Sequence, residues 1–189
     1  MKGISLIKSK SEVRSLITGS ETVEIIDLGI HGYADSFFAP EEEEKASYGL
    51  PLICRLDVET GLVQTQIVTD PNDRYSGVDY SYTSSNSETS KKHWIEFANY
   101  IRGRRSTRDS KILEVGSNDG FLLSQFRDNA SQITGVDASP YMSNLATSQG
   151  IQTFAGIFGE DENLLGELIQ RSKTYDLIFA NNVLNHSNN

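Results

Sequence analysis

The residues best suited to bind a ligand lie in a turn bracketed by two glycines, Gly116–Gly120. The turn follows the apolar run Lys111–Val115, which is typical of a buried strand. Gly116 would let a ligand approach bare backbone, and Gly120 would let the following helix pack closely on the strand. The amide groups at the N-terminus of that helix would then face the ligand. The spacing therefore predicts a ligand-binding turn at the carboxyl end of a strand.

An acidic residue, Asp137, ends the next apolar run, Ile133–Asp137, about 20 residues after the glycine turn. A carboxylate at the tip of the second strand is the usual partner of a ribose diol, because it accepts both hydroxyl protons. The alternative is an exposed carboxylate in a turn, and the preceding glycine turn favours the ribose partner. Asp137 is therefore predicted to bind a ribose.

Three classes of ligand use a turn of this kind, and the spacing separates them. A phosphate-binding P-loop requires Gly-Lys-Ser/Thr, which this sequence lacks. A dinucleotide site prefers G-x-G-x-x-G, whereas this turn is G-x-x-x-G preceded by Glu114. S-adenosyl-L-methionine has no pyrophosphate, and Glu114 and Asp119 would accommodate its positive charges. The spacing thus favours an adenosyl-sulfonium cofactor over a nicotinamide cofactor.

Strands and helices alternate from Lys111 to Asn189, which predicts the scaffold that holds these residues. Such alternation implies right-handed crossovers and a parallel sheet. The predicted strands are Lys111–Val115, Ile133–Asp137, Ile151–Phe154 and Tyr175–Ala180, and the predicted helices are Phe121–Arg127, Tyr141–Gln149 and Glu162–Arg171. The predicted fold class is therefore α/β, with a partial Rossmann-type sheet of four parallel strands and helices at residues 111–189.

A small mixed α+β domain is predicted before this sheet, at residues 1–87. Short apolar or β-branched runs there are separated by Gly, Pro, Ser and Asp. The expected strands are Ile4–Ile7, Val23–Asp27, Pro51–Leu56 and Leu62–Val68. Ser85 and Glu88 have the spacing of a capping box and predict a helix that continues to Arg102. This helix and a polar linker form a connecting segment at residues 88–110.

The charge and the cysteine usage of the chain exclude some partners. The formal net charge is −9, whereas a nucleic-acid partner requires a surplus of Lys and Arg to neutralise phosphates. No apolar run approaches the length that is needed to cross a bilayer. The single cysteine, Cys54, cannot form an internal disulfide, which fits a reducing, cytoplasmic setting. We therefore expect a small-molecule substrate, with no nucleic acid and no membrane.

Three motifs of the chain resemble those of the sugar C-methyltransferases of deoxysugar biosynthesis. They are Leu113–Leu123 (LEVGSNDGFLL), Gly135–Pro140 (GVDASP) and Asp176–His186 (DLIFANNVLNH), of which the last is the most specific. Upstream segments such as Tyr48–Leu52 and Tyr80–Ser87 follow the family's order, so the resemblance covers nearly the whole chain. The family joins an N-terminal zinc-binding domain, a Rossmann methyltransferase domain and a C-terminal domain. The resemblance implies C-methylation of a nucleotide-linked deoxysugar with S-adenosyl-L-methionine.

The resemblance and the turn together imply a cofactor site and a catalytic group. The cofactor-binding residues would be Glu114, Gly116, Ser117, Asn118, Asp119, Gly120, Asp137 and Ser85. His186 and a tyrosine of the pair Tyr80 and Tyr82 match positions around the methyl-accepting carbon. An imidazole and a phenol there could move the proton that must leave before carbon attacks the methyl group. The alternatives are a histidine that caps backbone and tyrosines that serve packing or the surface.

The chain departs from this family at the zinc site, which there uses two Cys-x-x-Cys pairs. Asp57 and Thr60 stand where the second pair is expected, the first pair is absent, and Cys54 is out of step with both. Tetrahedral zinc requires four Cys or His ligands. We therefore predict no zinc and no other metal, with an N-terminal fold held by its own packing.

The second departure is the end of the chain at Asn189, just after the fourth predicted strand. The resemblance implies three further strands and further catalytic groups beyond this point. The fourth strand would then be an open edge at which a second copy or a complementing chain pairs. The chain is accordingly interpreted as a methyltransferase or as its cofactor-binding portion, whose turnover depends on groups beyond Asn189. The alternative is a non-catalytic binding or interaction module derived from a truncated methyltransferase.

Overall fold

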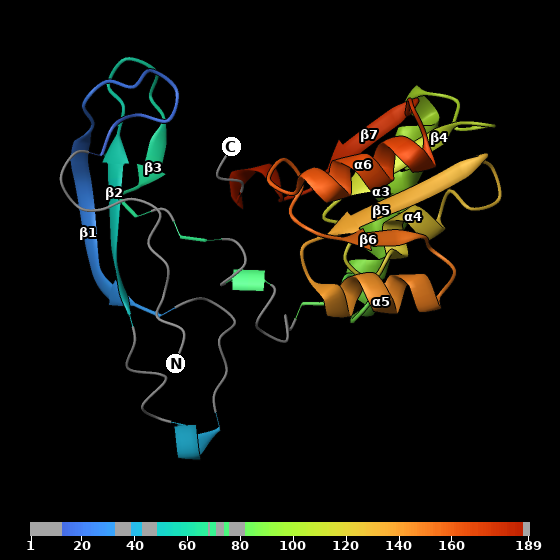
Figure 1. The fold of residues 1–189 in the computed structure, drawn as a ribbon, viewed down its shortest axis with the longest axis horizontal. Helices are drawn as coiled ribbons and strands as arrows, with labels where there is room; N and C mark the ends of the chain where they lie inside the picture. The colour runs from blue at the N-terminus through green and yellow to red at the C-terminus, as the bar shows by residue number, and fades with distance from the viewer. Residues whose placement is uncertain are drawn as a thin grey trace. The chain divides into compact units, whose positions relative to one another are not determined.

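The computed structural model describes residues 13–32, 39–42, 49–67, 69–70, 74–75 and 82–186. The chain forms two compact units, Met1–Arg74 and Tyr75–Asn189, called here the N-terminal unit and the C-terminal unit (Figure 1). None of the helices in these described ranges is long and apolar enough to span a membrane.

An antiparallel sheet of three strands, in the order β1-β2-β3, forms the N-terminal unit. The elements are β1 (Val23–His31), the short 3-10 helix η1 (Pro40–Glu42), β2 (Leu50–Leu56) and β3 (Val63–Thr65). β1 continues well beyond its predicted end at Asp27. β3 ends earlier than predicted, where the Thr65 hydroxyl donates to the carbonyl of Ile67 at 3.1 Å and competes with strand pairing. The predicted strand Ile4–Ile7 lies outside the described residues.

A parallel sheet of four strands, in the order β6-β5-β4-β7, forms the centre of the C-terminal unit. The elements in chain order are α3 (Glu88–Arg104), β4 (Lys111–Val115), α4 (Phe121–Ser124), β5 (Gln132–Asp137), α5 (Pro140–Ser148), β6 (Thr153–Ala155), α6 (Glu162–Arg171), β7 (Leu177–Ala180) and the 3-10 helix η2 (Leu184–His186). The predicted α/β fold class, with four parallel strands and helices, is confirmed.

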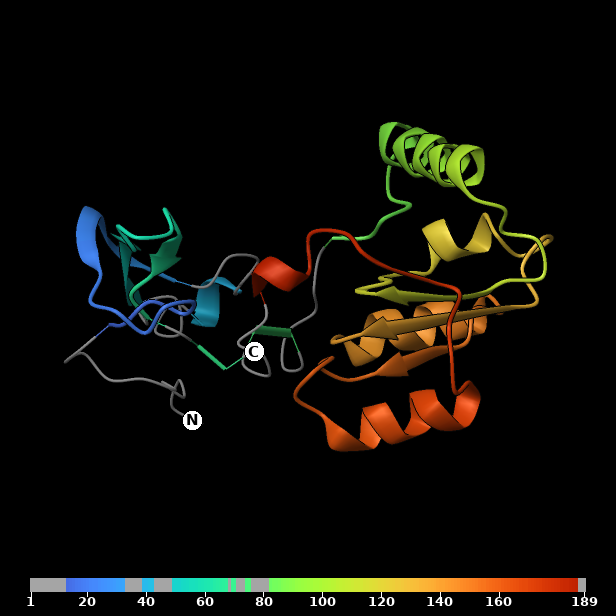
Figure 2. The same cartoon turned by 90° about the horizontal axis from the view of Figure 1, so that it is seen from above.

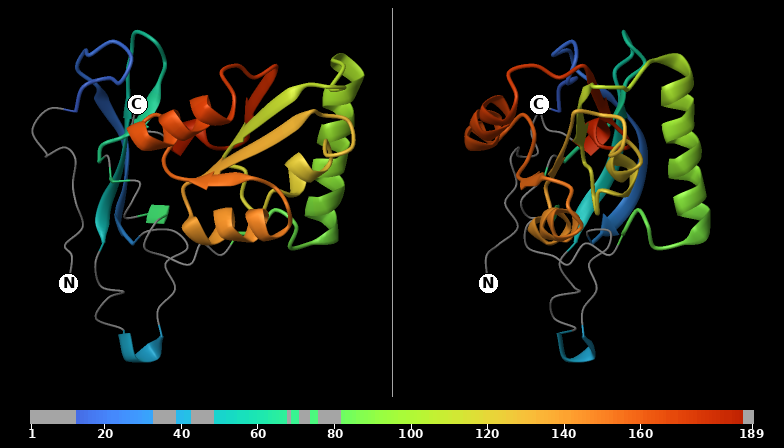
Figure 3. Two further views of the ribbon diagram at one scale, coloured as in Figure 1. Left: turned by 45° about the vertical axis from the view of Figure 1, so that its right-hand side comes forward. Right: turned by 90° about the vertical axis from the view of Figure 1, so that its right-hand side faces the viewer.

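Both faces of the central strand β4 are covered, as is usual for strands inside a parallel sheet. Ile112 of β4 packs in one core cluster with residues of α3, α4 and α5, and its neighbour Leu113 packs in a second cluster with Leu164 and Leu168 of α6. Figure 2 and the right-hand view of Figure 3 show α3 and α6 on opposite sides of the sheet. Strand β4 is therefore buried on both faces, and it positions the turn that follows it.

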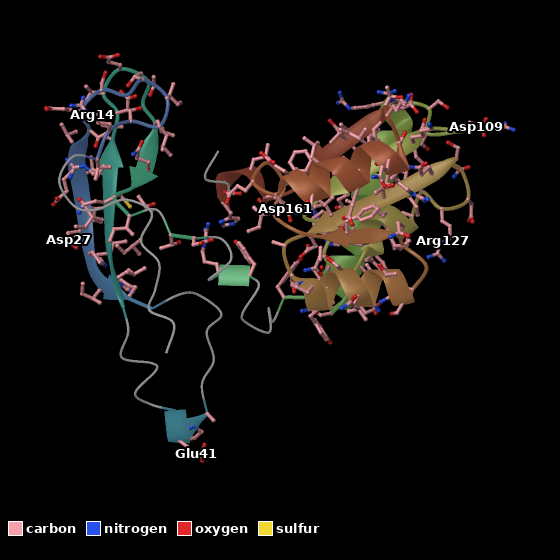
Figure 4. All side chains as sticks on the ribbon, viewed as in Figure 1. Arg14, Asp27, Glu41, Asp109, Arg127 and Asp161 are labelled. Carbon is pink, nitrogen blue, oxygen red and sulfur yellow. The ribbon has the colours of Figure 1, made fainter. Side chains whose placement is uncertain are left out.

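Helix caps set the starts of the helices, and one of them differs from the prediction. Asp161, labelled in Figure 4, caps α6 by accepting the amides of Asn163 and Leu164 at 2.9 and 3.2 Å. The N-cap of α3 is Ser87, whose hydroxyl accepts the Ser90 amide at 3.1 Å. The predicted N-cap, Ser85, is wrong because its side chain bonds to Asp119 instead.

Candidate functional site

The glycine turn is fixed by backbone bonds to the neighbouring strand. The amides of Gly116 and Ser117 donate to the carbonyl of Val136 in β5, at 2.8 and 2.9 Å. Gly116, Asn118 and Gly120 have φ angles of +72°, +51° and +76°, which lie in the left-handed region. Two of these positions are glycines because that region strains other residues, and Asn is among the side chains that tolerate it best.

Each glycine of the turn is also required by a close neighbour. A Cβ on Gly116 would lie 2.2 Å from a methyl carbon of Val183, in the segment that follows β7. A Cβ on Gly120 would lie 3.1 Å from Ile151 and 3.2 Å from Ala146, so Gly120 permits close packing of α4. The space beside the Gly116 backbone is thus used by Val183, whereas the sequence suggested a ligand there.

Asp137 has the geometry of a carboxylate with free acceptor capacity. Its two oxygens accept one backbone amide each, from Asn118 at 2.8 Å and from Ser139 at 2.9 Å. Because a carboxylate oxygen can accept about two hydrogen bonds, each oxygen keeps a lone pair that no donor among the described residues occupies. Burial raises the pKa of Asp137, and so does the nearby charge of Asp119, while the two amide bonds lower it. A diol donor would complete its coordination.

Glu114 lies behind the turn, and its side chain is only 4% exposed. Burial raises the pKa of Glu114 well above its ordinary value, and the charges of Asp137 and Asp119 raise it further. Its Oε2 atom has no hydrogen-bond partner among the described residues. Three carboxylates therefore share one buried region, called here the acidic cluster (Glu114, Asp119 and Asp137). Such a region favours a cation and disfavours an anion.

Two side chains of the turn hold the segment that precedes α3. The Asn118 side chain accepts the Ser84 amide at 2.8 Å and donates to the Tyr82 carbonyl at 3.0 Å. Asp119 accepts both the amide and the hydroxyl of Ser85 through Oδ2, and the amide of Phe121 through Oδ1. The structure therefore brings Ser85 to the turn, but it does so through Asp119.

Ser117 faces the sheet. Its side chain is buried, and a Cβ on Gly135 of β5 would lie 2.4 Å from the Ser117 Oγ atom. The sequence prediction did not identify Gly135 as part of this packing. A glycine inside a strand is, however, a sequence signal for close approach of another group.

The predicted catalytic residues are not gathered into one place by the described contacts. Tyr82 is exposed and joins the turn through its carbonyl, and Tyr80 lies outside the described residues. His186 belongs to η2, where its ring packs edge-on against Tyr75 with centroids 6.4 Å apart. Its amide donates to the carbonyl of Val183 at 2.9 Å, so His186 is linked to the residue that covers Gly116.

The segment between β7 and η2 contains a further polar group. Asn182 has a φ angle of +54°, and the buried Nδ2 atom of Asn181 has no partner among the described residues. These two asparagines follow the carboxyl end of β7, beside the end of β4. In parallel α/β sheets, ligands bind outside the carboxyl ends of the strands.

Metal ligands are sparse in the part of the chain that the structure describes. No group of three or more His, Cys, Asp or Glu side chains there could hold a metal ion. The acidic cluster is thus an electrostatic region and has no ligand geometry for a metal.

Comparison with known proteins finds a family match for one part of the chain. A family model described as "Methyltransferase domain" matches residues 113–189, which is less than half of the chain. No protein with a curated description matches the sequence significantly.

Solved structures with some likeness include three methyltransferase-related proteins. The plantazolicin methyltransferase BpumL in complex with SAH is 21% identical, with 51% of this chain and 38% of that chain covered and a TM-score of 0.36. Aeropyrum pernix fibrillarin with natively bound S-adenosyl-L-methionine is 11% identical, with 83% and 66% covered and a TM-score of 0.37. A complex of the Haloferax volcanii Trm112 methyltransferase activator and a putative methyltransferase gives 19% identity, 40% and 38% coverage and a TM-score of 0.31.

The chain spans 38% of the length of two of these structures. The family match covers the last three residues of β4, the glycine turn, Asp137 and the segment with His186. Over residues 113–189 the chain is therefore similar to a methyltransferase domain.

Proposed function

We propose that this chain binds S-adenosyl-L-methionine at the carboxyl ends of β4 and β5, as part of a methyltransferase. The observation that carries the proposal is the free acceptor capacity of Asp137. Both of its oxygens are oriented by backbone amides, and each keeps a lone pair for a ribose hydroxyl. The glycine turn beside it lies within the part of the chain that matches the methyltransferase domain.

The acidic cluster supports this cofactor over a dinucleotide. Glu114, Asp119 and Asp137 interact electrostatically, and two of them have raised pKa values. A pyrophosphate would bring negative charge to a region that already disfavours it. A sulfonium and an ammonium group would bring positive charge instead and would favour the ionised carboxylates.

The methyl acceptor is proposed to be a carbon of a nucleotide-linked deoxysugar, on the resemblance of the motif Asp176–His186. A base removes the proton from a carbon next to a carbonyl, and the electron pair that remains attacks the methyl carbon. As the new carbon–carbon bond forms, the bond between the methyl carbon and sulfur breaks and its electron pair stays on sulfur, which leaves a methylated sugar and S-adenosylhomocysteine. His186, Tyr82 and Tyr80 are the candidates for the base. A cytoplasmic setting stays a prediction from the cysteine usage.

Calorimetric titration of the purified chain with S-adenosyl-L-methionine tests the cofactor proposal. We expect a Kd in roughly the micromolar to millimolar range that is typical of enzyme ligands. Asp137→Ala should weaken binding by at least about tenfold, because hydrogen bonds to a charged group each contribute about 1.5–3 kcal/mol. Asp128→Ala, at an exposed turn position, is the matched control and should leave the Kd unchanged. Equal affinities of the two variants, or tighter binding of NADH, would contradict the proposal.

A second candidate function, an interaction module, is supported by the exposed apolar edge of the C-terminal unit. Ile178 of the edge strand β7 is 57% exposed, and Leu165 and Ile169 of α6 are 54% and 52% exposed. Parallel strands are normally covered on both faces. A second copy or a complementing chain is the proposed occupant. Light scattering should then show a dimer or a heteromer, and Ile178→Lys should dissociate it. A chain that stays monomeric at all concentrations and binds no other chain would contradict this candidate.

A further inference from the structure

Two turns of the N-terminal unit share one sequence pattern and one backbone geometry. They are Ser15–Gly19 (SLITG), called the first turn, and Asp57–Gly61 (DVETG), called the second turn. In each turn the glycine amide donates to the carbonyl of the first residue, at 3.0 Å and 2.8 Å. Both glycines have left-handed φ angles, +70° and +77°. The two turns are therefore repeats of a single local structure.

The first side chain of each turn performs the same task. Ser15 Oγ accepts the amides of Ile17 and Thr18, both at 3.1 Å. In the second turn, Asp57 Oδ1 accepts the amides of Glu59 and Thr60, at 2.9 and 3.4 Å. In each turn, one side-chain oxygen of the first residue thus accepts the amides of the third and fourth residues.

The two turns meet at the second oxygen of Asp57. Ser15 Oγ donates to Asp57 Oδ2 at 2.5 Å, and Thr18 Oγ1 donates to the same atom at 2.9 Å. The Thr60 amide donates to Oδ1 of this carboxylate at 3.4 Å, and the Thr60 side chain is among the groups that lower its pKa. Asp57 is 0% exposed in the described structure, and Ser15 is buried beside it. The first and fourth residues of both turns therefore converge on one buried carboxylate.

A residue of β3 holds the first turn in this position. The Gln64 side chain accepts the Leu16 amide and donates to the Arg14 carbonyl, both at 2.9 Å. Arg14 is labelled in Figure 4, where it lies at the loop end of the N-terminal unit. The sheet therefore fixes the first turn against the second by side-chain bonds across 48 and 50 residues of sequence.

In a tetrahedral metal site built from two such turns, each turn supplies two ligands, from its first and fourth residues. The two turns of this unit have the same arrangement. The zinc implied by the resemblance would lie here, but the donors do not fit it. Structural zinc sites use thiolates and imidazoles, whereas three of these four residues offer neutral hydroxyls. The fourth, Asp57, already accepts hydrogen bonds from those hydroxyls.

We propose that the cluster of Ser15, Thr18, Asp57 and Thr60 replaces a metal at this meeting point and keeps the N-terminal unit folded without one. The Asp57 carboxylate is the common acceptor, and the hydroxyls and amides of both turns are the donors. The hydrogen bond from Ser15 is the largest of the effects that hold the pKa of Asp57 well below its usual range, against the opposing effect of burial. The carboxylate is thus ionised at neutral pH and holds the two turns together by charge-assisted bonds.

Metal analysis and hydrogen exchange on the full chain test the first half of this proposal. The purified chain should contain far less than one zinc per molecule. A chelator should leave amide exchange at Ile17, Thr18, Glu59 and Thr60 unchanged. Stoichiometric zinc in the purified chain, or loss of amide protection when a chelator is added, would overturn the proposal.

Asp57→Asn tests the role of the carboxylate. An amide nitrogen cannot accept the hydroxyl bonds, so amides of the first turn should exchange at least about tenfold faster, although they lie about 40 residues away in sequence. Asp27→Asn is the matched control, because among the described residues Asp27 accepts just the local Gly29 amide, at 2.8 Å, on an exposed strand. Equal exchange of the first turn in both variants would contradict the proposal.

A variant with cysteine at all four positions, S15C, T18C, D57C and T60C, tests the correspondence with a metal site. If the four side chains converge as described, this variant should bind one Co²⁺ per chain. The complex should show the absorption of tetrahedral cobalt with thiolate ligands, and the unmodified chain should show none. A four-cysteine chain that binds no cobalt would overturn the correspondence.

Discussion

Glu114 shows how one residue can oppose folding and favour binding. Its carboxylate is buried beside two other acids, which raises its pKa, and one of its oxygens has no partner among the described residues. A buried charge without a partner destabilises a fold, and natural proteins retain such strain mainly at functional sites. Glu114 is therefore expected to be a binding residue whose partner is a cation.

Glu114→Gln should separate the two effects. At a pH above the folded pKa of Glu114, removing the charge should raise the Tm by roughly 3 °C, which for a chain of this size corresponds to about 1 kcal/mol. The same change should weaken binding of S-adenosyl-L-methionine, because the cation loses its buried carboxylate. Glu162→Gln, an exposed first-turn position of α6, is the control and should change neither quantity by as much. Calorimetric scans and titrations measure both. A Glu114→Gln chain that is less stable and binds equally well would contradict this interpretation.

The raised pKa values of Asp137 and Glu114 predict opposite pH dependences for the stability of the C-terminal unit and for cofactor binding. Their folded pKa values are raised above the ordinary values of 3.8 and 4.5. The folded state therefore holds protons that the unfolded chain releases. The free energy of unfolding of the C-terminal unit should fall as pH rises from about 4 through the folded pKa values.

Cofactor affinity should rise over the same pH interval, because the ionised carboxylates bind the cation and the ribose. Urea titrations and calorimetry at several pH values give the two curves. Parallel curves would show that these two groups do not control binding.

Among the structural elements, the glycine turn was the most predictable and the segment before α3 was the least. Apolar runs bounded by glycine identified β4 and β5 because strands of a parallel sheet are buried on both faces. Ser85 and Ser87 both precede Glu88 closely, so spacing alone could not choose between them as the N-cap. The choice depends on Asp119, which is distant in sequence and captures Ser85. The contact of Gly116 with Val183 is likewise long-range, and no local pattern reports it.

Asn118→Gly should release the segment before α3 from the turn without straining the backbone. Glycine tolerates the left-handed φ of this position, so the change removes only the bonds to Ser84 and Tyr82. Exchange of the Ser84 amide should become about tenfold faster, since a net hydrogen bond contributes about 0.5–1.5 kcal/mol. Asn118→Ala should lose the same bonds and add about 1 kcal/mol of backbone strain. Unchanged exchange in the glycine variant would show that the side chain does not hold the segment.

The two serines that precede α3, Ser85 and Ser87, give a paired test of which one caps the helix. Ser87→Ala should destabilise α3 by about 1 kcal/mol, the usual contribution of an N-cap. Ser85→Ala should leave the helix cap intact and remove only the hydroxyl bond to Asp119 Oδ2, which still accepts the backbone amide of residue 85. Hydrogen exchange along α3 distinguishes the variants. Greater fraying in Ser85→Ala than in Ser87→Ala would reverse the assignment.

For the whole molecule, the two units should respond to acid in opposite directions. Asp57 has a lowered pKa, so it stabilises the N-terminal unit above about pH 4, and this stabilisation is lost as pH falls. Asp137 and Glu114 have raised pKa values and make the C-terminal unit relatively more stable in acid. Amide spectra recorded from pH 7 to pH 2 should therefore lose β1–β3 signals before β4–β7 signals, with most of the loss below pH 4. Loss in the reverse order would contradict the assigned roles of these three carboxylates.

The contact between Gly116 and Val183 has a consequence for communication within the C-terminal unit. One methyl group of Val183 occupies the place of a Gly116 side chain, and the carbonyl of Val183 holds the amide of His186. Val183 thus contacts both the binding turn and the backbone of His186. A ligand that moves the turn is expected to move Val183 and, through its carbonyl, the backbone of His186, and linkage between two sites is reciprocal. Occupancy of the turn and the position of η2 are therefore expected to be coupled, and shifts of the Val183 and His186 amide signals on addition of S-adenosyl-L-methionine would measure that coupling.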